Sequence, residues 1–142
     1  MNILKILTPK RLLGNLGEDA AARYLKRQKY KILARNYVAD CGEVDIVAKD
    51  GDTTVFIEVK ARTYKEPSPY TARPAAAVNK EKQRRLIGCA ARYMHDRFTE
   101  GRVRFDVVEV YTERVGERDR VKKINHIKAA FDKSSAYAGY KG

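Results

Sequence analysis

Acidic and basic side chains alternate with aliphatic ones in two short segments of the chain. Residues 42–47 and 55–60 both have the composition and the alternation of β-strands. Their charged positions are Glu43, Asp45, Glu58 and Lys60. Because successive residues of a strand point to opposite faces, the charged residues of each segment share one face, and the aliphatic residues between them point to the core. Carboxylates and an amine on one face are groups that can bind a divalent cation and a phosphate.

The turn between the two strands decides whether their charged faces coincide. Asp50 and Gly51 are a strong signal for a two-residue hairpin loop, since both tolerate positive φ. With that loop Asp45 lies diagonally across from Glu58, and with a four-residue loop the two residues lie directly opposite each other. A three-residue loop would place them on opposite faces of the sheet. We expect an even loop and therefore one shared patch.

Carboxylates gathered in such a patch repel one another. At ~4 Å and an effective dielectric constant of about 20, each like-charge pair costs roughly 4 kcal/mol. A proton, the neighbouring Lys60 or a bound cation must offset that cost. Mg²⁺ uses one or two carboxylates together with water and phosphate oxygens, and Lys60 could orient or deprotonate a water beside the ion. The pattern therefore predicts metal-assisted hydrolysis of a phosphodiester; the alternative is an ordinary half-solvated strand whose charges contribute little.

The chain is long enough for one domain with its own core, and it carries a large positive charge. It has 142 residues, of which 30 are basic and 18 acidic, giving a net charge of +12. Such a balance favours a polyanionic partner, first nucleic acid and second an anionic membrane surface. The sequence shows neither a secretion signal nor a transmembrane segment. We expect a cytoplasmic protein that binds nucleic acid, above all DNA, and no membrane.

The cysteines and histidines argue against a zinc site. Cys41 and Cys89 form no Cys-x-x-Cys pair, and the chain has two histidines, His95 and His126. Scattered cysteines indicate a reducing compartment, but the sequence leaves a single disulfide between them open. Cys89 falls within a helical pattern, where a small core residue is expected.

Periodicity predicts two long helices and five strands. The helices cover residues 9–29 and about 80–98, and the second follows Asn79, a good N-cap. The expected strands are 30–38, 42–49, 53–62, 103–111 and 120–127. The hairpin makes part of the sheet antiparallel, and the strand–helix–strand crossover after it favours a parallel pair. This αβββαββ order predicts an α/β fold with a mixed β-sheet flanked by two main helices.

One domain accounts for most of the chain. We expect it to span residues 1–131, with residues 1–8 as an N-terminal extension. Residues 132–142 have no periodicity and are expected to form a disordered tail. Residues 63–78 contain three prolines, with tyrosines and basic residues among them. Such a long irregular connection is typical of a functional or a mobile loop, and its aromatic rings could stack on bases.

The second predicted helix begins with a cluster of cations. Cations at a helix N-terminus oppose the helix macrodipole, so a phosphate-binding role would explain them; the alternative is a solvated basic face. The residues that we expect to contact nucleic acid are Arg62, Lys80, Lys82, Gln83, Arg84 and Arg85.

Seven short segments, taken in their order along the chain, resemble the motifs of a known protein family. They are Leu16-Gly17-Glu18-Asp19-Ala20-Ala21, Ala34-Arg35-Asn36-Tyr37, Gly42-Glu43-Val44-Asp45-Ile46-Val47, Val55-Phe56-Ile57-Glu58-Val59-Lys60-Ala61-Arg62, Lys82-Gln83-Arg84-Arg85-Leu86, Arg104-Phe105-Asp106-Val107-Val108 and His126-Ile127-Lys128-Ala129-Ala130-Phe131. In this order they resemble the YraN family of predicted endonucleases, within the PD-(D/E)xK superfamily of restriction-endonuclease-like and Holliday-junction-resolvase-like nucleases. Val44 stands where that superfamily usually has a proline, and Ile87 stands where RecB-like members have a tyrosine.

The resemblance implies roles for particular residues. Asp45 and Glu58 would ligate Mg²⁺ or Mn²⁺, with the backbone carbonyl of Val59 beside them. Lys60 would position or activate the attacking water. Glu18 would be the helix-borne acid that completes the site in some members of the superfamily. Resolvases of this fold are commonly dimers, which suggests a homodimer.

Charge, motif and resemblance together predict a metal-dependent endonuclease with a restriction-endonuclease-like fold. Its expected substrate is DNA, with branched or processed DNA as candidates. The alternative is a non-catalytic nucleic-acid-binding module whose nuclease site is vestigial. Metal-dependent turnover would separate the two.

Overall fold

Five strands and three helices make up the described part of the chain. The computed structural model describes residues 9–65 and 78–142, with side chains from Asn15 onward. The elements are α1 (Pro9–Arg27), β1 (Lys31–Ala39), β2 (Gly42–Asp50), β3 (Thr53–Thr63), α2 (Lys80–Asp96), β4 (Val103–Val115), β5 (Arg118–Phe131) and α3 (Lys133–Ala136). The predictions for the N-terminal extension, residues 1–8, and for the centre of the long loop, residues 66–77, lie outside the described residues.

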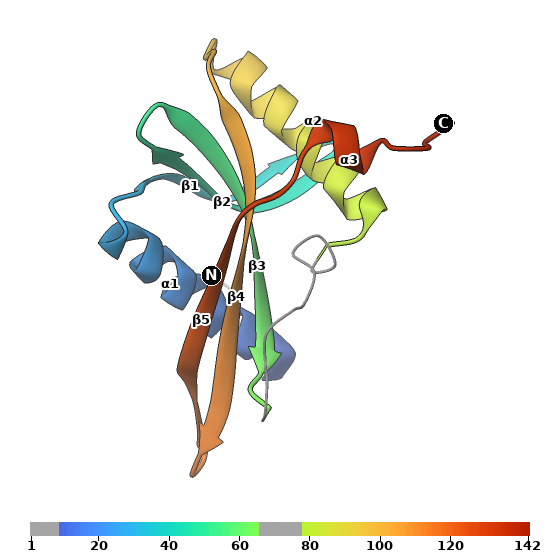
Figure 1. The fold of residues 1–142 in the computed structure, drawn as a ribbon. Helices are drawn as coiled ribbons and strands as arrows, with labels where there is room; N and C mark the ends of the chain where they lie inside the picture. Colours follow the sequence, from blue (N-terminus) through green and yellow to red (C-terminus); the bar gives the residue numbers. More distant parts are fainter. Residues whose placement is uncertain (1–8, 66–77) are drawn as a thin grey trace, which may run out of the picture.

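The strands form one sheet in chain order, β1-β2-β3-β4-β5 (Figure 1). β3 and β4 are parallel and are joined through α2, whereas the other neighbouring strands are antiparallel. A parallel pair needs a long crossover connection, and α2 lies within it. The predicted α/β fold with a mixed sheet is therefore confirmed.

A main helix packs on each face of the sheet, because residues of the central strands alternate between two apolar clusters. Val55 and Ile57 of β3 belong to the cluster that contains Ala21 and Leu25 of α1. Phe56, which lies between them in β3, belongs to the cluster of α2. Strands that are buried on both faces have continuous apolar runs of this kind. The sheet is therefore the middle layer of three.

The β2–β3 hairpin sets the register of the acidic residues. Its loop is Gly51-Asp52, and Asp50 pairs with Thr53. The loop has the predicted length but lies one residue further along than the Asp50-Gly51 prediction, with Gly51 at a positive φ of 60° in its first position. The resulting register is the one expected for a four-residue loop, in which the two acidic positions face each other directly.

The C-terminal residues fold against α2, contrary to the prediction of a disordered tail. α3 is a single turn stabilised by a capping box between Asp132 and Ser135. Lys80 of α2 donates to the Ser135 carbonyl over 2.6 Å, and the Arg84 guanidinium lies 4.3 Å from the ring centroid of Tyr140. A capped single turn held by such contacts needs no amphipathic repeat, so periodicity could not reveal it.

A buried network of charged side chains links β4 to β5. Asp106 is 1% exposed, and its two carboxylate oxygens accept hydrogen bonds from Arg104 over 2.8 and 3.0 Å. His126 Nε2 lies 2.8 Å from the same carboxylate, and the Ala129 N–H donates to it over 3.0 Å. Burial alone would raise the pKa of Asp106, but these hydrogen bonds outweigh burial and hold it below its ordinary value.

Replacing Asp106 by Asn should destabilise the fold at neutral pH by about 2–4 kcal/mol, because Arg104 then loses its buried carboxylate. The folded pKa of Asp106 lies below the unfolded value of ~3.9. Its contribution is therefore present above about pH 4 and is lost as the pH falls through the folded pKa. Urea unfolding as a function of pH should show the two proteins converging in acid.

The matched control for this substitution is Asp119→Asn, which removes an exposed partner of Arg114 at 3.4 Å. Exposed pairs contribute little, so this variant should unfold like the wild type. Equal stability of Asp106→Asn and the wild type at neutral pH would show that the network does not stabilise the fold.

Candidate metal centre

β2 and β3 diverge beyond their hairpin (Figure 1). We call the region where they part the fork, and the candidate site lies there. The pairing of the two strands reaches Ile46 and Ile57. Beyond that pair, residues 42–44 pair with β1 and residues 58–63 pair with β4. Beyond the last pair, the facing edges of β2 and β3 no longer pair with each other. Their backbone N–H and C=O groups are therefore available to side chains in the fork.

Asp45 and Glu58 are the first residues of the two strands beyond that last pair. The N–H of Val59, on the freed edge of β3, donates to Asp45 Oδ2 over 2.8 Å. This hydrogen bond draws the Asp45 carboxyl across the fork toward β3. There it interacts with Glu58 through charge and a side-chain hydrogen bond. The structure thus brings together the two acids that the sequence predicts to meet.

Two lysines from different elements balance the charge of Glu58. Glu58 is 5% exposed, and its Oε2 lies 3.2 Å from Lys60 Nζ and 3.9 Å from Lys82 Nζ on α2. A buried carboxylate requires such partners. The side chains of Lys60 and Lys82 are 37% and 35% exposed. Both ammonium groups therefore lie between the buried acid and the solvent.

Asp45 holds a proton close to neutral pH in this arrangement. Burial raises its pKa, the charge of Glu58 raises it further, and the hydrogen bond from Val59 lowers it, with a net value of about 7. A carboxyl group must lose its proton to bind a metal, so metal binding releases protons. The pair is therefore suited to exchange a proton for a divalent ion near neutral pH.

Glu18 lies near these acids but belongs to a second acidic pair. With its amide nitrogen toward the carboxylates, Asn36 donates to Glu18 Oε1 over 3.1 Å and to Glu43 Oε1 over 3.2 Å. Burial raises the pKa of Glu18, the charge of Arg35 lowers it and the charge of Glu43 raises it. The charge of Glu18 also contributes to the raised pKa of Asp45. Glu18 thus affects the fork through charge.

The oxygen donors of the fork fit an ion that takes two carboxylates. Within residues 15–65 and 78–142, no three side chains of His, Cys, Asp or Glu form a metal-binding group. Mg²⁺ ordinarily uses one or two carboxylates and completes its shell with water and phosphate oxygens. Asp45 and Glu58 supply that number, and the resemblance implies the Val59 carbonyl as a further oxygen donor. Glu18, which the resemblance implies as an additional acid in some members of the superfamily, does not form a three-carboxylate group with them.

The predicted nucleic-acid contacts on and near α2 are partly engaged within the protein. Gln83 is 1% exposed and donates to the Val78 carbonyl over 2.8 Å, so its prediction as a surface contact is wrong. Its amide instead fixes the start of α2, a contact that no spacing rule reveals. The other five predicted contact residues have partly or fully exposed side chains, although each also contacts a carboxylate or a backbone carbonyl of the protein. They are Arg62, Lys80, Lys82, Arg84 and Arg85.

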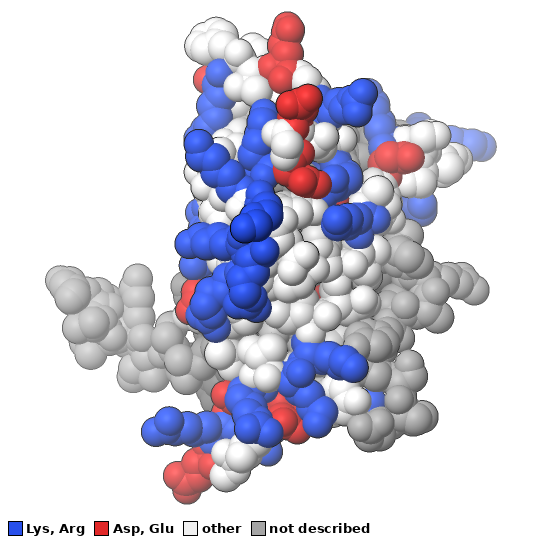
Figure 2. All heavy atoms as spheres, turned by 60° about the vertical axis from the view of Figure 1, so that its left-hand side comes forward, with Lys and Arg blue, Asp and Glu red and all other residues white. Residues whose placement is uncertain are grey.

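Basic side chains also gather away from α2. Figure 2 shows a band of Lys and Arg running down the side of the molecule on which α1 lies. Exposed basic residues at the end of α1 and the start of β1 are Arg23, Lys26, Arg27, Lys29 and Lys31. The positive charge is therefore spread over more than one face. None of the described helices is long and apolar enough to cross a membrane.

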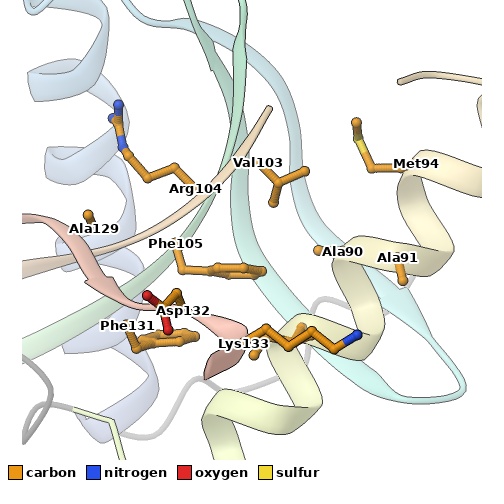
Figure 3. A pocket seen from close by; sticks show the side chains of 11 residues that line it. Ala90, Ala91, Met94, Val103, Arg104, Phe105, Ala129, Phe131, Asp132 and Lys133 are labelled. Carbon is orange, nitrogen blue, oxygen red and sulfur yellow. The ribbon is translucent and has the colours of Figure 1, made fainter. Parts of the chain in front are cut away.

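An apolar hollow lies between α2, β4 and the C-terminal residues (Figure 3). It has a volume of about 470 Å³, and Ala90, Met94, Phe105 and Phe131 are among its lining residues. Its lining includes none of the predicted site residues. The paired acids and the neighbouring amine lie in the fork, so the candidate site is separate from the hollow.

Two features of the site escaped the sequence analysis. Asn36 bridges the outer acidic pair from a left-handed backbone position with a φ of 53°. Asn tolerates that conformation and is otherwise depleted in strands, so its presence in a strand pattern was an available signal. The second feature is Lys82, which contacts Glu58 and is also partly exposed to solvent. The two residues lie far apart along the chain, so the sequence pattern did not indicate this contact.

Asp45 should titrate near pH 7, and Glu58→Gln should lower its pKa by removing the neighbouring charge while leaving it buried. Because the folded pKa lies above the unfolded value of ~3.9, the stabilisation from Asp45 is complete below about pH 4 and is lost as the pH rises through the folded pKa. Carboxyl carbon NMR shifts followed against pH would measure both values.

The control for this titration is Glu113→Gln, because Glu113 pairs with Arg120 and Lys122 on β5, apart from the fork. That variant should leave the Asp45 titration unchanged. An Asp45 pKa near 4 in the wild type would show that the two acids do not share a buried fork in solution.

Comparison with known proteins places the chain in a family. Residues 17–110 match the model of the family described as "Uncharacterised protein family UPF0102". A UPF0102 protein of Pelotomaculum thermopropionicum is 41% identical over 123 residues, which cover 86% of this chain and 97% of the relative. A UPF0102 protein of Caldicellulosiruptor saccharolyticus is 43% identical over 123 residues, covering 86% and 98%. Another, of Acetivibrio thermocellus, is 42% identical over 124 residues, covering 86% and 92%. With this identity over most of its length, and in agreement with the YraN-like pattern of its motifs, the chain belongs to the UPF0102 family.

Proposed function

We propose that this protein is a metal-dependent nuclease that hydrolyses phosphodiester bonds in DNA. The observation that carries the proposal is the convergence of three groups in the β2–β3 fork. The Asp45 carboxyl accepts from the N–H of Val59, the residue after Glu58, over 2.8 Å, and Lys60 Nζ lies 3.2 Å from Glu58. Two buried acids beside a partly exposed amine are the groups that metal-assisted phosphodiester hydrolysis uses. The net charge of +12 supports a polyanionic substrate.

Each residue of the fork has a distinct role in this proposal. Asp45 and Glu58 would hold Mg²⁺ or Mn²⁺, which acts as a Lewis acid and lowers the pKa of a bound water. The Val59 N–H holds the Asp45 carboxyl in the fork. Lys60 lies beside Glu58 and reaches solvent, where its ammonium can orient a water or donate to a phosphate oxygen. Lys82 adds a second positive charge on the α2 side of the same acid.

The architecture supports a place in the PD-(D/E)xK superfamily. A mixed sheet of five strands with a main helix on each face is compatible with a restriction-endonuclease-like fold. The Asp and the Glu-x-Lys lie on neighbouring strands, as the proposed superfamily roles require. We therefore extend the superfamily roles to Asp45, Glu58 and Lys60, with branched or processed DNA as the candidate substrate.

A non-catalytic nucleic-acid-binding module is the second candidate function. One observation favours it: the charges of the fork are largely balanced, because the raised pKa of Asp45, about 7, leaves much of this carboxyl neutral at neutral pH and Glu58 contacts two lysines. Such a site carries little uncompensated charge without an ion. This alternative keeps the DNA affinity and removes the turnover.

Substitution of the fork residues should greatly lower the rate of DNA cleavage. With Mg²⁺ or Mn²⁺, wild-type protein should cut single-stranded, duplex or four-way-junction DNA, and Asp45→Asn, Glu58→Gln and Lys60→Met should each lose roughly 10²–10³-fold in rate. The reason is loss of a metal ligand in the first two variants and of the positive charge in the third. Gel analysis of labelled substrates with and without chelator measures the effect.

The control for cleavage is Asp119→Asn, which removes a carboxylate from the β4–β5 hairpin and should keep full activity. Metal-independent cutting, or equal rates in wild type and the three fork variants, would identify a contaminating nuclease and refute the proposal. If the protein binds DNA but cuts none of the three substrates, the result would support the non-catalytic binding module.

The start of α2 should contribute to DNA affinity. Lys82→Gln combined with Arg85→Gln should weaken binding and reduce the slope of log K against log salt by about 0.9 for each phosphate that the protein no longer neutralises. Fluorescence anisotropy in the presence of chelator would measure binding without cleavage. The control variant combines Arg118→Gln with Arg120→Gln at the start of β5, and it removes the same number of positive charges. An equal loss of affinity in that control would assign the affinity to overall charge.

A further inference from the structure

The two thiols of the chain lie in contact outside the fork. Cys41 follows β1, and its Sγ lies 2.7 Å from the Sγ of Cys89 on α2. Both are free thiols; Cys41 is partly exposed and Cys89 is fully buried. The chain has two cysteines in all, so each is the sole intramolecular partner of the other. A contact between residues 48 positions apart is set by the fold and not by local sequence.

The backbone beside each thiol lies close to the other cysteine. Gly42 follows Cys41 with a φ of 139°, a conformation that other residues rarely adopt, and a Cβ placed on it would lie 3.9 Å from Cys89 Sγ. A Cβ placed on Gly88, beside Cys89, would lie 3.6 Å from Cys41 Cβ. The β1–β2 turn therefore rests directly on α2, with a glycine next to each cysteine.

We propose that Cys41 and Cys89 form a reversible disulfide that locks the β1–β2 turn to α2. The oxidant is a disulfide of a low-molecular-weight thiol. The Cys41 thiolate attacks one of its sulfurs, and the first small thiolate leaves with the electron pair of the broken S–S bond. Cys89 then attacks the Cys41 sulfur of the mixed disulfide and displaces the second small thiolate. The protons lost by Cys41 and Cys89 end on the two small thiols, so one disulfide is reduced as one is formed.

The environments of the two thiols fix the order of these steps. Burial raises the pKa of Cys89 to about 12, and its contact with Cys41 is part of that rise. Thiolate is the reacting species in disulfide exchange, so Cys89 is a poor first nucleophile. Cys41 reaches solvent and reacts first. Cys89 needs no access to the oxidant, because its target is already in contact with it.

The disulfide would join the turn that leads into β2 to α2, the helix that carries Lys82. Cys41 lies four residues before Asp45 on the chain, and Cys89 lies two helical turns after Lys82 on α2. Oxidation would therefore fix the position of the start of β2 relative to α2. Any effect on DNA cleavage rests on the proposed function, whereas formation of the bond does not.

The test is a redox titration of the full chain in mixtures of reduced and oxidised glutathione, under native conditions and in denaturing urea. After acid quenching and alkylation, intact-protein mass reports free thiols, mixed disulfides and the internal bond. We expect the equilibrium constant for the internal bond to be about a hundredfold greater in the folded protein. We also expect the oxidised protein to melt several degrees above the reduced one.

Cys41→Ser on the turn and Cys89→Ala in the helix are the controls, since each leaves one thiol and should show no oxidant-dependent rise in Tm. The Cys41→Ser control stands even if the buried substitution impairs folding. An equilibrium constant no greater in the folded protein than in urea would overturn the proposal, as would oxidation only to intermolecular dimers. Neither measurement uses metal or DNA, so a failure here leaves the nuclease proposal to its own test.

Discussion

The enforced proximity of two buried carboxyl groups is the constraint on which the site depends. Asp45 and Glu58 meet where β2 and β3 part, and their repulsion is offset by a proton on Asp45 and by the ammonium groups of Lys60 and Lys82. The backbone contributes as well, because the strand that leaves its partner presents the Val59 N–H to Asp45. α2 supplies Lys82, and the sheet supplies the other groups. Moving any of these elements would leave a buried charge without its partner.

The period of a β-strand made the central pair of the site predictable. Alternation placed Asp45 on one strand and Glu58 on the next, and the requirement for an even loop placed them on a common face. The structure moves the loop to Gly51-Asp52 yet keeps them together, because a shift of the loop by one residue changes the register by two. The parallel pairing of β3 and β4 was also predictable, since a helix between two strands provides the long connection that it needs.

Other parts of the structure depend on contacts between distant segments and had no local signature. α3 is held by a capping box and by Lys80, so its aperiodic sequence gave the wrong prediction of disorder. Gln83 stands in a run of basic residues that suggested a surface, but its amide is buried against Val78. Helical spacing places such side chains on a face of the helix; whether that face meets protein or solvent is decided by the tertiary packing.

The arrangement of the sheet also predicts an order for the steps of folding. The β2–β3 hairpin joins neighbours in sequence, whereas β3 meets β4 only after the whole α2 crossover has closed. Loop-closure entropy makes local pairing fast and distant pairing slow. In a nascent hairpin Asp45 and Glu58 still face water, where their repulsion is weak. We therefore expect the full electrostatic cost of placing the two acids side by side to arise late in folding, when α2 packs on the sheet, excludes this water and brings Lys82 to Glu58.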